Sequence, residues 1–83
     1  MPSEERLLQA LAKAIRERRE ALGPAATQEE IAHKAGISVR QLQKIEGGHY
    51  SPRLQTLLTL ARALKTNAQS LLDRAEELQL RRR

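Results

Sequence analysis

Two helix-capping patterns that stand close together constrain this chain more than any other feature of its sequence. Thr27 and Glu30 have the three-residue spacing of a capping box, whose side chains bond the free amides at the start of a helix. Ser38 and Gln41 repeat this spacing, and Gly36 between the two boxes tolerates the left-handed conformation that ends helices. The sequence therefore predicts two short helices joined by a very tight turn.

Apolar side chains recur at helical spacing along the rest of the chain and predict three further helices. The first is expected over about residues 4–22, another after Ser51-Pro52, and the last after Asn67, which can cap it. Leucine and alanine supply most of the apolar content, and Tyr50 is the one aromatic residue. Because this composition favours packed helices over a sheet, we expect an all-α fold of five helices.

A chain of 83 residues is too short to divide its apolar content between two cores. We expect one domain over residues 1–83, with a core over 8–73 and a C-terminal helix and basic tail over 74–83. Since small cores are often supplemented by oligomerisation, we predict a homodimer interface on the last helix. Its apolar stripe consists of Leu71, Leu72, Ala75 and Leu78. The alternative is that this stripe packs back on the first and fourth helices, which for Leu71 is equally compatible with the spacing.

Several classes of function lack support in the sequence. The chain has no cysteine, which excludes disulfides, thiolate metal sites and cysteine nucleophiles. His33 and His49 have no second ligand at a spacing typical of metal sites, and no catalytic constellation is present, so we expect no metal, no cofactor and no enzyme. No apolar run is long enough to span a bilayer, and the acidic N-terminus is unlike a secretory signal, so we expect a cytoplasmic protein.

The net charge of +5 is concentrated in the middle of the chain. Residues 1–37 carry six basic and six acidic side chains, whereas residues 38–65 carry five basic side chains against Glu46 alone, an excess of +4. The triple-arginine tail lies in residues 66–83, whose excess is only +1. A central basic excess is typical of a face that binds a polyanion, although a solubilising charge would look similar.

The two short helices have the form of a helix-turn-helix, in which the second helix presents side chains to a partner. Ala32 supplies the small residue needed where the helices cross. Ile37, Leu42 and Ile45 supply apolar contacts beneath the second helix. The polar side chains between these positions are thus left for the surface.

Four segments between Leu11 and Leu72 carry capping, turn and apolar positions in register: AIRERREALG, TQEEIAHKAGIS, LQKIEGG and SPRLQTLLTLARAL. Together they resemble the Cro/repressor, or XRE, family of helix-turn-helix regulators. The resemblance implies a five-helix lambda-repressor-like domain that binds double-stranded DNA sequence-specifically, with the helix at about 38–47 in the major groove. It further implies a homodimer on a pseudo-palindromic operator. Phage repressors, antitoxins and restriction-modification controllers all occur among family members of this size.

The resemblance assigns base contacts to Val39, Arg40, Gln41 and Lys44, with Gln43 at the margin. Their chemistry fits these roles, because arginine and lysine donate to guanine, glutamine pairs with adenine, and valine packs on a thymine methyl group. An ordinary solvated face is an equal reading for the two glutamines.

Phosphate contacts implied by the resemblance fall on five residues: Gln28, Ser38, His49, Tyr50 and Arg53. Gln28 is also expected to brace the recognition helix. Tyr50 has filling of the core as a competing role.

The family also pairs a glutamate, here Glu46, with an arginine of the first helix, here Arg19. Two departures from the family pattern concern helix ends. The loop from Gly23 to Thr27 is about two residues longer than usual, which puts phosphate contacts there in doubt. Lys65 replaces a common glycine, and Arg53 replaces a small capping residue, so these helix ends are expected to differ locally.

Two functions of different classes follow from these observations. The leading hypothesis is a dimeric, sequence-specific transcription regulator. The alternative is a protein-interaction module that uses the helix-turn-helix core as a scaffold and binds its partner through the last helix and the arginine tail.

Overall fold

The computed structural model describes residues 2–80, in which five α-helices and no strand are present. The helices are α1 (Pro2–Ala21), α2 (Gln28–Ala35), α3 (Val39–Glu46), α4 (Leu54–Ala63) and α5 (Ala68–Leu80). The predicted all-α fold of five helices is confirmed, and α1 begins two residues earlier than expected and ends one residue earlier. None of the helices in this range is both long and apolar enough to cross a membrane.

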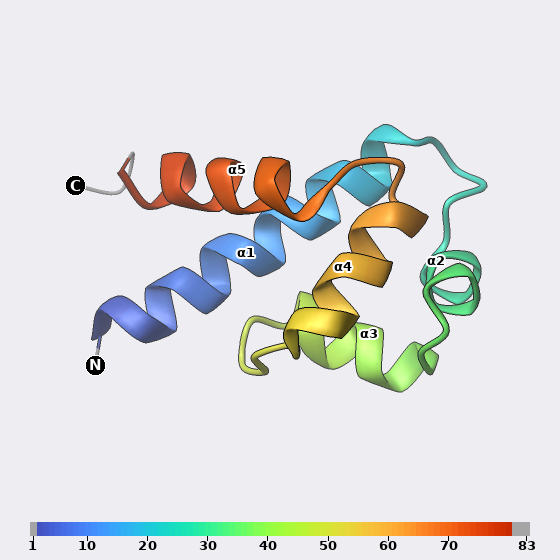
Figure 1. The fold of residues 1–83 in the computed structure, drawn as a ribbon, viewed down its shortest axis with the longest axis horizontal. Helices are drawn as coiled ribbons and strands as arrows, with labels where there is room; N and C mark the ends of the chain where they lie inside the picture. Colours follow the sequence, from blue (N-terminus) through green and yellow to red (C-terminus); the bar gives the residue numbers. More distant parts are fainter. Residues whose placement is uncertain (1, 81–83) are drawn as a thin grey trace.

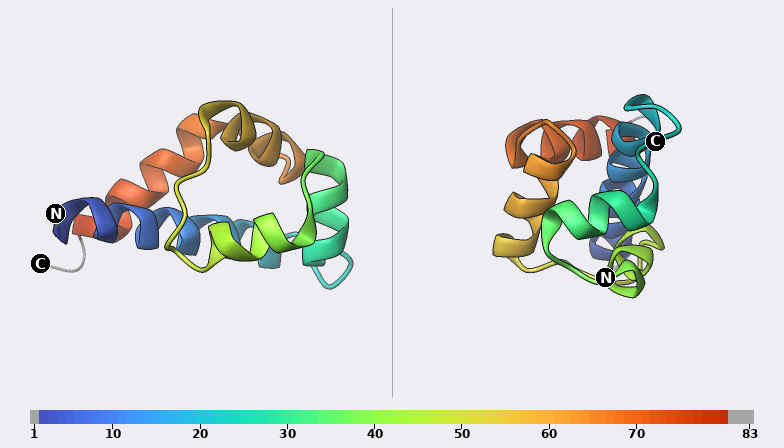
Figure 2. Two further views of the ribbon diagram at one scale, coloured as in Figure 1. Left: turned by 90° about the horizontal axis from the view of Figure 1, so that it is seen from below. Right: turned by 90° about the vertical axis from the view of Figure 1, so that its right-hand side faces the viewer.

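The helices form two groups (Figure 1). α1 and α5 run antiparallel and pack side by side, so that the start of α1 and the end of α5 lie at the same end of the molecule. α2, α3 and α4 gather towards the other end, where α2 contacts both α3 and α4 (Figure 2). The two groups also pack on each other, because α3 contacts α1 and α4 contacts α5.

One hydrophobic core joins all five helices. Its largest fully buried side chains are Ile15, Ile31, Leu42, Ile45, Leu60 and Leu64. Burial of each such side chain contributes about 1.5–3 kcal/mol of transfer free energy. The core also includes Ala75 and Leu78, so it extends beyond residue 73, where the sequence analysis placed its end.

The apolar stripe of α5 packs inside the chain, which corrects the predicted dimer interface. Leu71, Ala75 and Leu78 are 3%, 0% and 8% exposed and belong to the core that α5 shares with α1. Of the four predicted interface residues, Leu72 alone is exposed, at 39%. This leucine spacing suits packing on a helix of the same chain as well as on a helix of a second copy. In this structure the α5 stripe packs on α1 of the same chain.

The tight turn between α2 and α3 forms as the two capping patterns predict. Thr27 Oγ1 accepts from the Glu30 amide at 3.1 Å, and Ser38 Oγ accepts from the Gln41 amide at 3.0 Å. Gly36 takes the left-handed conformation, with φ of 74°, and the following amide donates to the Ala32 carbonyl at 3.0 Å. This is a Schellman ending, which satisfies free carbonyls and lets the next helix begin at once.

The end of α4 uses a lysine where glycine is the residue of lowest strain. Lys65 has φ of 58°, a conformation that costs a residue with a side chain roughly 1–2 kcal/mol. Arg18 of α1 offsets this strain, because its guanidinium donates to the Leu64 carbonyl at 2.9 Å and to the Lys65 carbonyl at 2.8 Å. At the other end of α4, Arg53 is the N-cap and makes no capping bond through its side chain.

Candidate nucleic-acid interface

The exposed face of α3 carries three polar side chains that the sequence analysis assigned to DNA bases. Arg40, Gln43 and Lys44 are all exposed, and their spacing of three and four residues puts them on one face of the helix. Leu42 and Ile45 anchor the opposite face, at 0% and 2% exposure. The helix is therefore held by its apolar side and offers a polar, doubly cationic side to solvent.

The other two predicted base-contact residues are partly engaged within the chain. Val39 is half-buried and packs against the hydrophobic core. Gln41 is also half-buried, and its backbone N–H donates to the Ser38 hydroxyl oxygen. Ser38 itself is exposed, and because its oxygen accepts this bond, its hydroxyl hydrogen stays free for an acceptor such as a phosphate.

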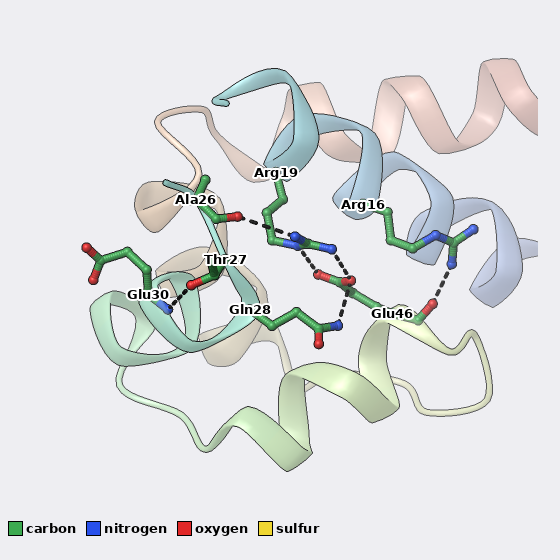
Figure 3. A network of polar contacts seen from close by, with 7 residues as sticks. All are labelled: Arg16, Arg19, Ala26, Thr27, Gln28, Glu30 and Glu46. Carbon is green, nitrogen blue, oxygen red and sulfur yellow. Dashed lines mark hydrogen bonds and ion pairs between the residues drawn. The ribbon is translucent and has the colours of Figure 1, made fainter. Parts of the chain in front are cut away.

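The last residue of α3, Glu46, is held by a buried polar network (Figure 3). Its carboxylate accepts two bonds from the Arg19 guanidinium, from Nε at 2.8 Å and from Nη2 at 3.0 Å. Gln28 Nε2 donates to the same carboxylate at 3.0 Å. Glu46 is only 4% exposed, so these bonds replace those that water would make. The pairing expected between Glu46 and Arg19 is confirmed.

Two further bonds extend this network along the chain. Arg19 Nη1 donates to the Ala26 carbonyl at 3.3 Å in the loop before α2, and Arg16 Nη1 donates to the backbone carbonyl of Glu46 (Figure 3). Among the side chains of residues 5–80, every buried nitrogen and oxygen has a hydrogen-bond partner. The network ties α1, the loop before α2, and the first residue of α2 to the end of α3, which fixes the orientation of the exposed face.

The guanidinium of Arg19 keeps its charge under all ordinary conditions. Its hydrogen bonds to Glu46 raise its pKa above the usual arginine range, and this effect outweighs the opposing effect of burial. Because arginine is already fully protonated near neutral pH, this rise in its pKa does not change the charge of Arg19 there.

Gln28 is half-buried and uses its side-chain nitrogen as a donor to Glu46. It therefore braces α3 from the first turn of α2, as the family resemblance implies. Its contact with a DNA phosphate stays a prediction.

The loop after α3 is held against α1 by Gly48. This glycine is buried with φ of 81°, and a Cβ atom built on it would lie 3.2 Å from the Cα atom of Gln9. The close approach positions the loop so that His49, Tyr50 and Arg53, three predicted phosphate contacts, are all exposed. Tyr50 is 37% exposed and does not take the competing role of filling the core.

The loop and α3 together border a shallow groove of about 500 Å³. Its lining residues are Arg40, Gln43, Lys44, Gly47, His49 and Tyr50. The structure thus brings the predicted base-contact and phosphate-contact groups next to each other at the C-terminal end of α3.

Sequence reasoning missed two arginines of α1 that bond the ends of other helices. Arg16 and Arg18 donate to backbone carbonyls at the ends of α3 and α4, which lie 30 and 47 residues away along the chain. The sequence feature that could have indicated these bonds is the cluster of basic residues in the last turns of α1, because the free carbonyls at every helix end can accept from such side chains. Which carbonyls these side chains meet depends on how the helices cross.

Two short helices joined by a glycine turn, with a polar face exposed on the second, define a helix-turn-helix DNA-binding domain. In a comparison with protein families, residues 15–71 match the helix-turn-helix family. The chain belongs to this family and is a DNA-binding transcription regulator of the Cro/repressor, or XRE, type. A comparison with curated proteins gives no match.

Proposed function

We propose that this regulator binds a pseudo-palindromic operator as a homodimer, with α3 in the major groove of each half-site. The observation that carries the proposal is the exposed stripe of Arg40, Gln43 and Lys44 on a helix whose end is fixed by the buried Glu46 network. A major groove admits one α-helix, and two-fold related helices read half-sites roughly 34 Å apart.

The side chains divide into two roles within this proposal. Arg40 and Lys44 donate to the acceptor pair of guanine, and Gln43 pairs with adenine, because these groups are exposed on the helix face. Val39 and Gln41 contribute at the N-terminal end of α3, Val39 by packing on a thymine methyl group and Gln41 by pairing with an adenine edge.

The phosphate contacts lie on either side of this stripe. Ser38 precedes the helix, and His49, Tyr50 and Arg53 follow it on the exposed loop. Arg53 is the strongest electrostatic contributor of this group because it is always charged. Gln28 completes the phosphate contacts from the first turn of α2, where backbone amides favour an anion.

Selection of operators from random duplex DNA, followed by titration of salt, tests the proposal. We expect enrichment of a palindromic site and an affinity that falls as the salt concentration rises. Arg40→Ala should cost about 1–3 kcal/mol of binding free energy and relax base preference at one position of each half-site. Arg53→Ala should weaken all sequences alike and lower the salt slope by about one.

Arg6→Ala is the matched control, because Arg6 is exposed on α1 and lies outside the proposed contact set. It should leave base preference unchanged. Equal effects of Arg40→Ala and Arg53→Ala on base preference would contradict the assigned roles. No enriched site, together with an affinity insensitive to salt, would favour the alternative of a protein-interaction module.

A further inference from the structure

Two consecutive glycines, Gly47 and Gly48, lie between the recognition helix and the proposed phosphate contacts. They separate Glu46, the last residue of α3, from His49 and Tyr50 in the exposed loop. Glycine loses more conformational freedom on ordering than any other residue, so this pair can act as a hinge between helix and loop. The direction in which the loop leaves α3 is therefore set by the contacts around this glycine hinge.

Arg16 of α1 supplies such a contact on the helix side of the hinge. The backbone carbonyl of Glu46 is one of the free carbonyls at the end of α3, because its helical donor would be the amide of Tyr50, beyond the helix. Arg16 Nη1 donates to this carbonyl from α1 (Figure 3). The carbonyl belongs to the planar peptide group that joins Glu46 to Gly47, so the bond fixes the orientation of that peptide where the hinge begins.

The bond from Arg16 holds a part of Glu46 that the rest of the network does not hold. Arg19 and Gln28 bind only the carboxylate of Glu46, which rotatable bonds separate from the backbone. Arg16 lies one turn before Arg19 on α1 and binds the backbone of the same residue. The two arginines therefore have different effects, one on the side chain that anchors α3 and one on the chain that leaves it.

α1 also contacts the second residue of the hinge. Gly48 is buried, its amide donates to the Ile45 carbonyl at 3.2 Å, and a Cβ atom built on it would lie 3.2 Å from the Cα atom of Gln9. Gln9 and Arg16 lie on the same face of α1, about two turns apart. One face of α1 thus holds both ends of the hinge.

The placement of the loop determines part of the groove beside α3. Gly47, His49 and Tyr50 line this groove together with three polar side chains of α3. A loop that is already ordered in the free protein loses little conformational entropy when it binds, and this raises affinity without any new contact. A residue that orders the hinge therefore favours binding even if it does not touch the partner.

We propose that Arg16 is a positioning residue for DNA binding, which acts through the Glu46 carbonyl to hold the glycine hinge in the conformation that presents His49 and Tyr50 to phosphates. The guanidinium of Arg16 itself touches no phosphate, so it changes the ordering of the loop and not the number of ionic contacts. The inference rests on the proposed function in one respect, which is the assignment of phosphate contacts to this loop.

Amide hydrogen exchange of the free full chain, followed by NMR, tests the hold on the hinge. Arg16→Ala should raise the exchange rates of the two hinge amides by at least about 10-fold, the factor expected for loss of a hydrogen bond from a charged group. Arg16→Met keeps the apolar stem without the donors and should give the same result, which separates the bond from side-chain packing. Because Arg16 is half-buried and both replacements are strong helix formers, far-UV circular dichroism should show unchanged helix content.

Arg18→Ala is the matched control for a general loss of stability. Arg18 makes the same kind of bond from α1, to two backbone carbonyls at the end of α4. Its removal should raise the exchange rate of the Lys65 amide, which donates to the Arg62 carbonyl there, and leave the hinge amides at the wild-type rate.

Binding to a DNA duplex of random sequence is the second measurement, because phosphate contacts do not depend on base sequence. Arg16→Ala should raise the dissociation constant about 10-fold, since the loop must then be ordered on binding. The dependence of affinity on salt should keep its wild-type slope, whereas loss of a direct phosphate contact would lower the slope by about one. Arg18→Ala should bind close to wild type, and so should Lys13→Ala, which removes an exposed charge of α1 one turn before Arg16.

Three results would overturn the proposal. The first is wild-type exchange of the hinge amides in Arg16→Ala and Arg16→Met. The second is a loss of affinity in Arg16→Ala no larger than that in Arg18→Ala. The third is a salt slope lowered by about one in Arg16→Ala, which would make Arg16 a direct phosphate contact. Failure of the proposed function is a different outcome, because operator selection would then enrich no palindromic site, while exchange rates measured without DNA still decide whether Arg16 holds the hinge.

Discussion

Two arginine–glutamate pairs join α1 to other helices, and they differ in their burial. Arg19 and Glu46 lie 2.8 Å apart with side chains 17% and 4% exposed, and they connect α1 to the recognition helix α3. Arg74 and Glu17 lie 3.0 Å apart with side chains 34% and 38% exposed, and they connect α5 to α1. Each pair joins an arginine guanidinium to a glutamate carboxylate and has one further partner, because Glu46 also accepts from Gln28 and Arg74 also pairs with Glu77. Burial is the main difference between the two regions.

The difference shows which pair the fold depends on. In the buried pair, removal of one partner leaves a desolvated charge without compensation, which is strongly destabilising. In the exposed pair, water solvates whichever partner is left, and salt screens the attraction. The region that carries the proposed DNA contacts is therefore fixed by a buried network, whereas the α1 and α5 pair is held mainly by apolar packing.

The largest effect is expected from removal of the buried carboxylate. Glu46→Ala leaves Arg19 and Gln28 without their shared acceptor and should lower the free energy of unfolding by about 3–5 kcal/mol. Urea denaturation followed by far-UV circular dichroism measures this change. Glu17→Ala is the matched control on the exposed pair and should lower Tm by about 4 °C or less in thermal unfolding, in which Glu46→Ala should lower Tm several times more. A similar loss in both variants would show that burial does not distinguish the two pairs.

An intermediate effect is expected when Arg19 is replaced by lysine, which keeps the positive charge but lacks the planar guanidinium group. Arg19→Lys retains a cation near Glu46 but lacks the two parallel donors, so it should cost about 1.5–3 kcal/mol of stability. Arg74→Lys, on the exposed pair, should be close to wild type in the same denaturation experiment. If Arg19→Lys proved neutral, the charge alone would account for the buried pair and its geometry would be irrelevant.

The smallest effect is a dependence of stability on pH that comes from the exposed pair. The hydrogen bond from Arg74 lowers the pKa of Glu17 below the usual glutamate range, against a smaller opposing effect of burial. A depressed carboxyl pKa stabilises the fold above the unfolded-state pKa, which is about 4.3, and this contribution is lost as the pH falls through the folded-state value.

Thermal unfolding of wild type and Glu17→Gln across this range measures that contribution. The difference in Tm between them should be present at pH 7 and should shrink as the pH falls below about 4.3. A difference that grew on acidification would contradict the direction of the shift.

Local features of this fold were predictable because neighbouring residues in the chain create them. Thr27 and Ser38 cap the helices that they precede, and Gly36 takes the left-handed turn between them. Each of these depends on groups within a few residues. The exposure of Arg40, Gln43 and Lys44 follows in the same way, because Leu42 and Ile45 on the same helix occupy its buried side.

Long-range features were predictable only where the resemblance to a family supplied them. The pairing of Glu46 with Arg19 was expected on that ground, across 27 residues of sequence. The bond from Arg18 to the carbonyl of Lys65, across 47 residues, was not expected. No periodicity or capping pattern encodes such a contact, because an arginine can donate to any carbonyl that the fold brings within its range.

The leucine stripe of α5 marks the boundary between the two kinds of information. By itself the sequence determined that this stripe exists, that five helices form and where they are capped, since helical spacing and capping are local properties. Tertiary structure alone decided that Leu71 and Leu78 meet α1 in the same chain and that Leu54 and Leu58 of α4 stay exposed. The physical reason is that apolar burial has no direction, so a stripe specifies that it will be covered but not by which surface.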